Sequence, residues 1–387
     1  MRVEISDCIK YIGVDDRDID LFESQYIVPN GVSYNSYVIL DEKIAIMDTV
    51  DKRKGEEWLK NLEAVLDGKE PYYLVVSHIE PDHGSSIDML LKKYPNITIV
   101  GNAKTFTMIG QFFNLEVEYN KLVVADGDEL ELGSHSLKFI FAPMVHWPEV
   151  MVSYEKLEKV LFAADAFGKF GALDTDEDWA CEARRYYFNI VGKYGVQVQS
   201  LLKKVSAFEI ETICPLHGPI LSENLGYYIN LYDIWSSYKP EAEGVFIAYA
   251  SIHGNTAKVA REFKSMLEEK GAKKVAIADL SRDDLAECIE DAFKYGKVVL
   301  ASSSYDGGVF TPMHDFLAHL ATKGYKNRTV ALIENGSWGP TAARTMKAML
   351  EGMKDITICE NVVTIRSAMK PADKESLSVL ADELLSK

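Results

Sequence analysis

Short apolar runs separated by turns dominate about the first 240 residues of the chain. Runs at 44–50, 72–78, 97–102 and 137–144 are rich in the β-branched and aromatic residues that favour strands. The segment 54–66 instead places its apolar residues at helical spacing and predicts a helix. This half of the chain is therefore expected to mix α and β structure.

Three further segments of this half predict specific elements. The run at 115–120 predicts another strand. The segment 123–143 contains an Asp-Gly turn followed by alternating apolar and polar residues, which predicts a β-hairpin. The stretch at 176–206 has helical spacing over an unusual length and predicts a long helical region.

The pattern changes near residue 240. The polar segment 236–244 contains a Pro and a Gly and is interpreted as a linker. After it, five apolar runs alternate with helix-like segments over about 140 residues, which is typical of a doubly wound parallel sheet. We therefore predict an α/β chain with two domains, 1–243 and 244–387.

Composition and charge narrow the class of protein. The hydrophobic content is 47% and the charged content 26%, the profile of a soluble globular protein. A length of 387 residues is too great for one ordinary core and agrees with two domains. The net charge of −17 argues against nucleic acid as a partner, because phosphate binding needs a basic face.

The cysteine pattern and the lack of long apolar segments indicate the cellular compartment of the protein. The five cysteines are scattered without CxxC spacing, which suits a reducing cytoplasm and excludes a fused rubredoxin or ferredoxin module. The N-terminal sequence has no apolar stretch suited to a signal peptide. No segment approaches the roughly 18 apolar residues of a membrane span, so we expect a cytoplasmic protein with no membrane partner.

Seven potential metal ligands lie at the ends of apolar runs or in the loops that follow them, where a sheet scaffold places its chemistry. They are His78, Glu80, Asp82, His83, His146, Asp165 and His217. Four imidazoles and three carboxylates are enough for two ions if one carboxylate bridges them. A single His after a strand is more often an ordinary hydrogen-bonding residue, so the prediction depends on the whole ordered set.

The ligand types restrict the metal. The set contains no thiolate, which disfavours soft ions and closed structural zinc sites. Mixed imidazole and carboxylate ligands suit iron, manganese or zinc. Two neighbouring ions can hold one small molecule between them, and a diiron pair with open positions is suited to dioxygen or nitric oxide.

The first strand-to-helix loop of the second half is suited to a phosphate group. It contains Ser251, His253, Gly254, Asn255 and Thr256 at the start of a predicted helix, where N–H groups and the helix dipole favour an anion. It matches neither GxGxxG nor GxxxxGK[ST], which disfavours dinucleotides and nucleoside triphosphates. A single phosphate is what FMN offers.

Two later loops extend this candidate flavin site, because ligands of open parallel sheets bind beyond the carboxyl ends of the strands. The predicted contacts in them are Ser303, Ser304, Tyr305, Asp306, Gly307 and Gly308, and then Asn335, Gly336, Ser337, Trp338 and Gly339. The aromatic side chains of Tyr305 and Trp338 could stack on a flavin ring. The alternative is that both aromatics cap the core from loops.

The ordered segments HIEPDH, HWPEV, LFAADAFG, CPLHGPI and HGNT give the chain a clear resemblance over essentially its whole length. It resembles the flavodiiron proteins, also called A-type flavoproteins. The resemblance implies a metallo-β-lactamase-like αββα sandwich followed by a flavodoxin-like domain that binds FMN.

The resemblance also implies two non-haem irons. One would be held by His78, Glu80 and His146, and the other by Asp82, His83 and His217. Asp165 would bridge them together with an oxo or hydroxo group. Zinc hydrolases of the metallo-β-lactamase fold have a His where this chain has Glu80, so Glu80 favours iron.

Two positions near the implied sites depart from the family pattern. Gln25 stands near a point where several members have a His, and His253 stands before Gly-Asn-Thr where other residues are usual. Tyr26, beside Gln25, and Tyr194 are candidate proton donors at the metals. His253 could tune the flavin or its phosphate.

The implied activity is reduction of dioxygen to water, of nitric oxide to nitrous oxide, or of both, as protection for an organism that avoids oxygen. A separate rubredoxin or reduced deazaflavin would supply the electrons. The family arrangement implies a head-to-tail homodimer, alone or as a dimer of dimers. Two alternatives stay open: a zinc-dependent hydrolase fused to a flavodoxin-like domain, and an electron carrier whose first half is a metal-free scaffold.

Overall fold

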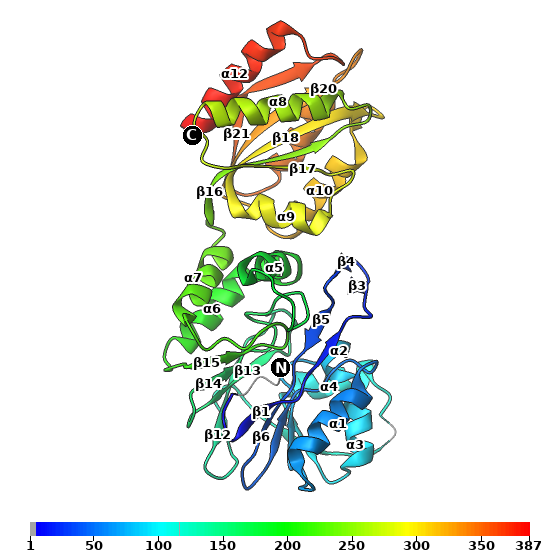
Figure 1. Cartoon of the computed structure of the whole chain (residues 1–387), viewed down its shortest axis with the longest axis vertical. Coiled ribbons are helices and arrows are strands. Elements are labelled where there is room, and N and C mark those ends of the chain that lie inside the picture. Colours follow the sequence, from blue (N-terminus) through cyan, green and yellow to red (C-terminus); the bar gives the residue numbers. More distant parts are fainter. Residues whose placement is uncertain (1–4, 116) are drawn as a thin grey trace. The chain divides into compact units, whose positions relative to one another are not determined.

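The computed structural model describes residues 5–115 and 117–387 (Figure 1). Its contacts divide the chain into two compact units, which we call unit 1 (Met1–Asp233) and unit 2 (Ile234–Lys387). The boundary predicted at 243/244 lies within strand β16 (Ala242–Ala250) and stays a prediction.

Two sheets form the centre of unit 1. The first has the strand order β1-β6-β7-β8-β9-β10, and the second has the order β11-β12-β13-β14-β15. The first sheet is built from Ile9–Tyr11, Tyr37–Ile39, Ala45–Met47, Tyr73–Val75, Thr98–Gly101 and Asn120–Val123. The second is built from Glu129–Glu131, Ser136–Phe141, Met151–Glu155, Val160–Phe162 and Thr212–Cys214. Two short ribbons pair β2 (Val14–Asp16) with β5 (Val32–Tyr34), and β3 (Leu21–Phe22) with β4 (Tyr26–Ile27).

The two sheets pack face to face, and helices cover their outer faces (Figure 1). Tyr37 and Ile39 of β6 point into the core between the sheets, whereas Val38 packs against the helices on the outer face, as the two-residue repeat of a strand requires. The helices of unit 1 are α1 (Gly55–Leu66), α2 (Pro81–Gly84), α3 (Ile87–Lys93), α4 (Ala103–Phe112), α5 (Trp179–Tyr186) and α6 (Gly195–Val205), and α7 (Leu225–Ser236) crosses into unit 2. The predicted αββα sandwich is confirmed.

Two local predictions need correction in detail. In the predicted strand 115–120, residue 116 lies outside the described residues, 117–119 are not in a strand, and β10 begins at Asn120. The predicted hairpin forms between β11 and β12, but its turn spans 132–135 rather than the Asp-Gly turn. That Asp-Gly turn instead precedes β11, where the Asp126 carboxylate accepts a hydrogen bond from the Phe141 N–H at 2.7 Å.

The long helical region at 176–206 is present but irregular. A π-helical segment (Tyr187–Val191) and a 3-10 turn (Gly192–Tyr194) separate α5 from α6. Such π segments are frequent at functional sites.

Unit 2 is built around a parallel sheet with the strand order β17-β16-β18-β20-β21, which confirms the predicted doubly wound architecture. Its further strands are β17 (Val275–Asp279), β18 (Tyr295–Tyr305), β20 (Arg328–Asn335) and β21 (Ile356–Ile365), and β19 (Gly308–Val309) pairs with the end of β18. The helices are α8 (Asn255–Glu269), α9 (Leu285–Lys294), α10 (Thr311–Thr322), α11 (Ala342–Glu351) and α12 (Pro371–Ser386). The loops after β16, β18 and β20 meet at the carboxyl edge of the sheet, around its switch point.

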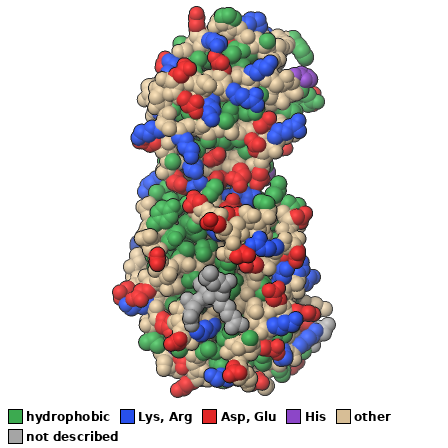
Figure 2. Space-filling model, viewed as in Figure 1, with side chains coloured by type: hydrophobic (Ala, Val, Ile, Leu, Met, Phe, Trp, Pro, Cys, Tyr) green, Lys and Arg blue, Asp and Glu red, His purple; other side chains and the backbone are tan. Residues whose placement is uncertain are grey.

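Acidic and basic side chains are interspersed over the viewed face of each unit (Figure 2). Among residues 5–115 and 117–387, we find no helix with the length and apolar character needed to cross a membrane.

Candidate metal centre and cofactor site

Loops from both sheets of unit 1 bring the seven predicted ligands together at one end of the sandwich. His78 follows β8, and the loop after it leads into the short helix α2, which carries Asp82 and His83. Asp165 follows β14, and His217 follows β15 in the second sheet. The remaining two, Glu80 and His146, come from the start of α2 and the loop between β12 and β13.

The seven side chains form two groups. In the first, ligand atoms of His78, Glu80, His146 and Asp165 all lie within 4.8 Å of one another. The Nε2 atom of His78 is 3.1 Å from Glu80 Oε2 and 3.3 Å from Asp165 Oδ2. The Nε2 atom of His146 is 3.0 Å from the same Glu80 oxygen and 3.1 Å from Asp165 Oδ2.

The second group contains Asp82, His83 and His217. The Nε2 atoms of the two imidazoles are 3.1 Å apart, and both face Asp82 Oδ2, at 3.4 Å from His83 and 3.3 Å from His217. His217 Nδ1 lies 2.7 Å from the carbonyl oxygen of Ser33 and donates to it, which leaves Nε2 directed at His83 and Asp82. Two imidazole Nε2 atoms and a carboxylate oxygen thus converge in the way that ligands surround a cation.

Asp165 connects the two groups through its two carboxylate oxygens. Oδ2 faces His78 and His146, and Oδ1 lies 3.4 Å from His83 Nε2 and 3.7 Å from His217 Nε2. Asp165 is 1% exposed, and its two oxygens face imidazole nitrogens of four candidate ligands at 3.1–3.7 Å. Because a buried carboxylate needs compensating positive charge, these atoms fit a pair of metal ions bridged by one carboxylate.

The electrostatics of the pocket agree with a strongly cation-binding site. Burial lowers the pKa of His146, but the carboxylates of Asp165 and Glu80 raise it to about 9. Burial raises the pKa of Asp165, but His78, His146 and His83 hold it well below its ordinary value. The carboxylates therefore stay ionised, and the site favours positive charge between them.

Several residues that hold the ligands were missed by the sequence analysis. Glu149 Oε1 accepts a hydrogen bond from His78 Nδ1 at 2.7 Å and from the Ile79 N–H at 3.0 Å. Asp48 accepts the Ser77 N–H at 2.7 Å and so fixes the chain next to His78. Glu149 stands in the quoted segment HWPEV, but nothing in its spacing pointed to His78.

Gln25, Tyr26 and Tyr194, which the sequence placed near the metals, each contact a neighbouring residue. The Tyr26 hydroxyl donates to the Asn189 carbonyl at 3.1 Å, and Lys193 lies over the Tyr194 ring at 5.0 Å. Gln25 Nε2 donates to Glu23 Oε2 at 3.1 Å in the turn between β3 and β4. The catalytic roles of Tyr26 and Tyr194 stay predictions.

Tyr186 is a tyrosine that the sequence analysis did not single out. Its buried ring centroid is 5.6 Å from that of His217, and its hydroxyl has no hydrogen-bond partner. Burial, followed by the charges of Asp165 and Asp82, raises the pKa of Tyr186 well above its ordinary value, so the hydroxyl keeps its proton.

Unit 2 has a cavity of about 420 Å³ at the carboxyl edge of its sheet. It is lined by all the predicted flavin-contact residues except Gly254 and Gly308, and additionally by Ile252, Thr341 and Ser367. The residues that line it are Ser251, Ile252, His253, Asn255, Thr256, Ser303, Ser304, Tyr305, Asp306, Gly307, Asn335, Gly336, Ser337, Trp338, Gly339, Thr341 and Ser367.

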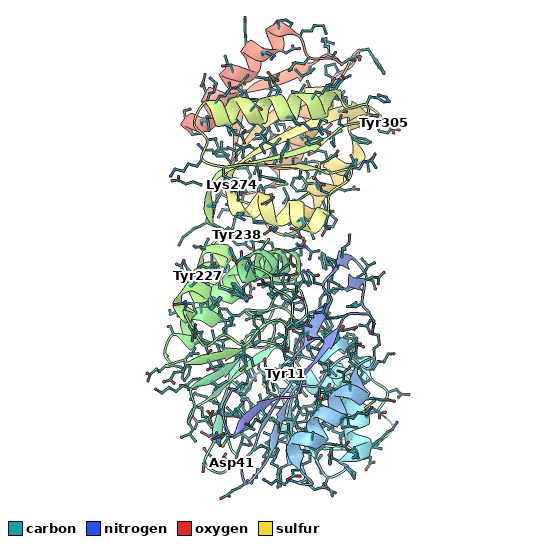
Figure 3. All side chains as sticks on the ribbon, viewed as in Figure 1. Tyr11, Asp41, Tyr227, Tyr238, Lys274 and Tyr305 are labelled. Atoms are coloured by element: carbon teal, nitrogen blue, oxygen red, sulfur yellow. The ribbon has the colours of Figure 1, made fainter. Side chains whose placement is uncertain are left out.

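The cavity combines an anion site with aromatic walls. Thr256, in the first turn of α8, has its hydroxyl 3.0 Å from Ser303 Oγ, so two loops meet at the end of the helix that favours a phosphate. Gly254 has φ +85°, a conformation that favours glycine in this turn. Trp338 is 95% exposed and Tyr305, labelled in Figure 3, is 47% exposed, so both rings are free to cover a flat ligand.

Known proteins resemble the chain over nearly its whole length. Residues 32–218 match the family model described as ODP family beta lactamase. The nitric oxide reductase of Moorella thermoacetica is 28% identical over 94% of this chain and 93% of its own length. The anaerobic nitric oxide reductase flavorubredoxin of Vibrio vulnificus is 26% identical over 97% of this chain and 77% of its own length.

Solved structures show the same fold. The rubredoxin oxygen:oxidoreductase of Desulfovibrio gigas superposes with a TM-score of 0.92 at 25% identity, over 100% of this chain and 98% of that one. The flavodiiron protein of Giardia intestinalis superposes with a TM-score of 0.91 at 24% identity, over 99% of this chain and 96% of that one. In sequence and in structure, with the two ligand groups and the cavity already described, the chain is similar over its whole length to flavodiiron proteins.

Proposed function

We propose that this protein reduces dioxygen to water, nitric oxide to nitrous oxide, or both, at a pair of non-haem irons that receive electrons from FMN. The chain is an oxidoreductase of the flavodiiron type. The observation that carries the proposal is the direction of the two Asp165 oxygens, one toward each group of ligands. The relatives named as nitric oxide reductases and as an oxygen:oxidoreductase support the choice of substrates.

The proposed iron ligands are those of the two groups. His78, Glu80 and His146 would hold one iron, Asp82, His83 and His217 the other, and Asp165 would bridge them. When bound, the two irons and FMN would supply the electrons that reduce the substrate. A zinc hydrolase is not favoured, because the similar proteins are oxidoreductases.

The protein's own side chains would orient the metal ligands and contact the substrate. Glu149 holds His78 through Nδ1, and the Ser33 carbonyl holds His217 through Nδ1, so both imidazoles keep Nε2 directed at the centre. The buried Tyr186 hydroxyl has no hydrogen-bond partner and its ring lies beside that of His217, so it would be available to hydrogen-bond to a bound substrate.

The finer features of the proposal follow the family resemblance. We propose FMN in the cavity of unit 2, a separate rubredoxin-type protein as electron donor with reduced deazaflavin as the alternative, and a cytoplasmic location. We also propose a head-to-tail homodimer, alone or as a dimer of dimers, in which the FMN of one subunit serves the irons of the other.

Asp165→Asn tests the central observation. Replacing one bridging oxygen by an amide nitrogen, which cannot bind a metal ion in the same way, should lower turnover of both gases to background while FMN stays bound. The measurements are iron and FMN content, and turnover after anaerobic reduction and mixing with dioxygen or with nitric oxide. Asp128→Asn, an exposed position of the same unit, is the matched control. Unchanged turnover in Asp165→Asn, or zinc without flavin in the wild type, would refute the proposal.

A further inference from the structure

A second set of metal-ligating side chains lies in unit 1, separate from the seven described above. The Cys8 sulfur, a ring nitrogen of His135 and a carboxylate oxygen of Glu158 all lie within 4.8 Å of one another. We propose that these three residues bind a zinc ion, which would be a third metal site in the chain. The proposal is independent of the proposed reduction of dioxygen or nitric oxide.

The cluster lies at the end of the sandwich away from the candidate iron ligands. Glu158 precedes β14 and Asp165 follows it, so the strand separates the two sites. His135 precedes β12, whereas His146 comes after that strand. Asp41, which contacts His135, follows β6 and is labelled at this end of unit 1 in Figure 3.

The hydrogen bonds of His135 direct one ring nitrogen at the cluster. Its Nδ1 lies 2.7 Å from Asp41 Oδ2, which also accepts the His135 N–H at 2.6 Å. The Asp41 carboxylate accepts from His135 Nδ1, which leaves Nε2 directed at Glu158 Oε1 at 3.3 Å. A ring nitrogen of His135, an oxygen of Glu158 and the sulfur of Cys8 therefore converge closely enough to hold one cation.

A zinc ion suits this position better than a proton on His135, because the sulfur of Cys8 is part of the same cluster. Cysteine, histidine and carboxylate are the usual zinc ligands, and three protein ligands leave the fourth tetrahedral position for water. A carboxylate behind the ligating histidine, here Asp41, is the common arrangement in zinc sites.

The backbone around the cluster is held in place before any metal binds. The Leu40 N–H donates to the Cys8 carbonyl at 2.8 Å, and the Lys43 N–H donates to the Leu132 carbonyl at 2.8 Å. Gly133 has φ +138°, and a Cβ built on it would lie 2.4 Å from Asp41 Oδ1, so the turn can approach Asp41 only with glycine there. A zinc ion here would join Cys8, beside the first sheet, to His135 and Glu158 of the second, and would stabilise their packing.

Zinc X-ray absorption on the full chain tests the site. The protein, loaded with iron and FMN, would receive one equivalent of zinc chloride and be desalted. We expect the zinc to be retained, with a sulfur neighbour at about 2.3 Å. A sulfur neighbour excludes the seven candidate iron ligands, none of which is a cysteine, and cysteine variants then distinguish Cys8 from Cys181. Zinc with only nitrogen and oxygen neighbours would overturn the proposal and indicate an Asp41–imidazolium–Glu158 ion network instead.

Cysteine variants show which cysteine provides the sulfur neighbour of the zinc ion. Cys8→Ser should remove the sulfur neighbour and weaken zinc retention at least tenfold, whereas Cys181→Ser, at another partly buried cysteine, should change neither. Loss of the sulfur neighbour in Cys181→Ser but not in Cys8→Ser would overturn the proposal. If Cys8→Ser fails to fold, alkylation of the wild type read by mass spectrometry replaces it. Zinc should slow the labelling of Cys8 but not of Cys181, and a chelator should restore it; equal labelling of Cys8 with and without zinc would refute the site.

Discussion

At the scale of single residues, the orientation of the histidines depends on side chains and carbonyls behind them. Glu149 accepts from His78 Nδ1, the Ser33 carbonyl from His217 Nδ1, and Asp41 from His135 Nδ1. In each case the outer partner determines which ring nitrogen carries the proton and leaves Nε2 for a metal. Such partners tune metal affinity without touching the metal.

Glu149→Gln should weaken iron binding about 10- to 100-fold, because the amide removes the negative charge that holds His78 Nδ1–H. The measurement is iron retained per chain after dialysis against increasing chelator. Glu155→Gln is the control, since Glu155, at the end of β13, is equally buried but accepts from the turn N–H groups of Leu157 and Glu158 and not from a candidate metal ligand. Equal chelator resistance of Glu149→Gln and wild type would contradict the role assigned to Glu149.

At the scale of elements, the last helix of unit 2 stabilises an irregular strand. The register between β20 and β21 shifts between Val330 and Leu332, which frees N–H groups of β21 from the ladder. Glu383 of α12 accepts two of them, from Glu360 at 2.6 Å and from Asn361 at 3.0 Å. One carboxylate thus satisfies the backbone donors that the irregular pairing leaves over.

Stability of unit 2 should therefore depend on the charge of Glu383. Burial opposes its ionisation, but the donors of Asn361, Lys387 and Glu360 lower its pKa from 4.5 to about 2. A lowered carboxyl pKa stabilises the fold fully above about pH 4.5, and the contribution is lost as pH falls through 2. Glu383→Gln should lower the free energy of unfolding by about 1–2 kcal/mol at pH 7.

Thermal unfolding of wild type and Glu383→Gln between pH 7 and pH 2 measures this effect. The difference between the two proteins should shrink steadily below pH 4.5. Glu375→Gln, at an exposed position of the same helix, should melt like the wild type throughout. A difference that does not change with pH would show that the charge of Glu383 is not responsible.

At the scale of the whole molecule, the two chemical sites lie in different units of the chain. The seven candidate iron ligands belong to unit 1, and the residues around the flavin cavity belong to unit 2. In the proposed head-to-tail homodimer, electrons pass from the FMN of one subunit to the irons of its partner.

Heterodimers that combine two inactive variants test this arrangement. Asp165→Asn disables the metal centre, and Thr256→Glu places a negative charge where the flavin phosphate is expected. Purified heterodimers carrying one variant in each subunit should recover about half of the wild-type turnover, because one of the two sites is complete across the interface. Heterodimers of Asp165→Asn with the double variant should be inactive. No recovery in verified heterodimers of the first kind would show that electrons pass within one chain.

Much of this protein could be predicted from the sequence because the relevant signals are local. The change from irregular apolar runs to regular strand–helix alternation indicated two architectures, and both are confirmed. The loops of the candidate sites follow apolar runs directly, so His78 and Thr256 could be singled out one by one. The exact turn of the β11–β12 hairpin could not be predicted, because the Asp126 carboxylate accepts a hydrogen bond from Phe141 instead of closing the hairpin.

The sequence by itself determined which residues could carry the chemistry, and the tertiary structure alone decided how they meet. Three arrangements depend on positions that are up to 150 residues apart in the sequence. Asp165 faces two groups of ligands, Glu149 supports His78, and Cys8 lies beside His135 and Glu158. No local periodicity encodes such contacts, because the packing of one sheet on another brings the ends of their strands together.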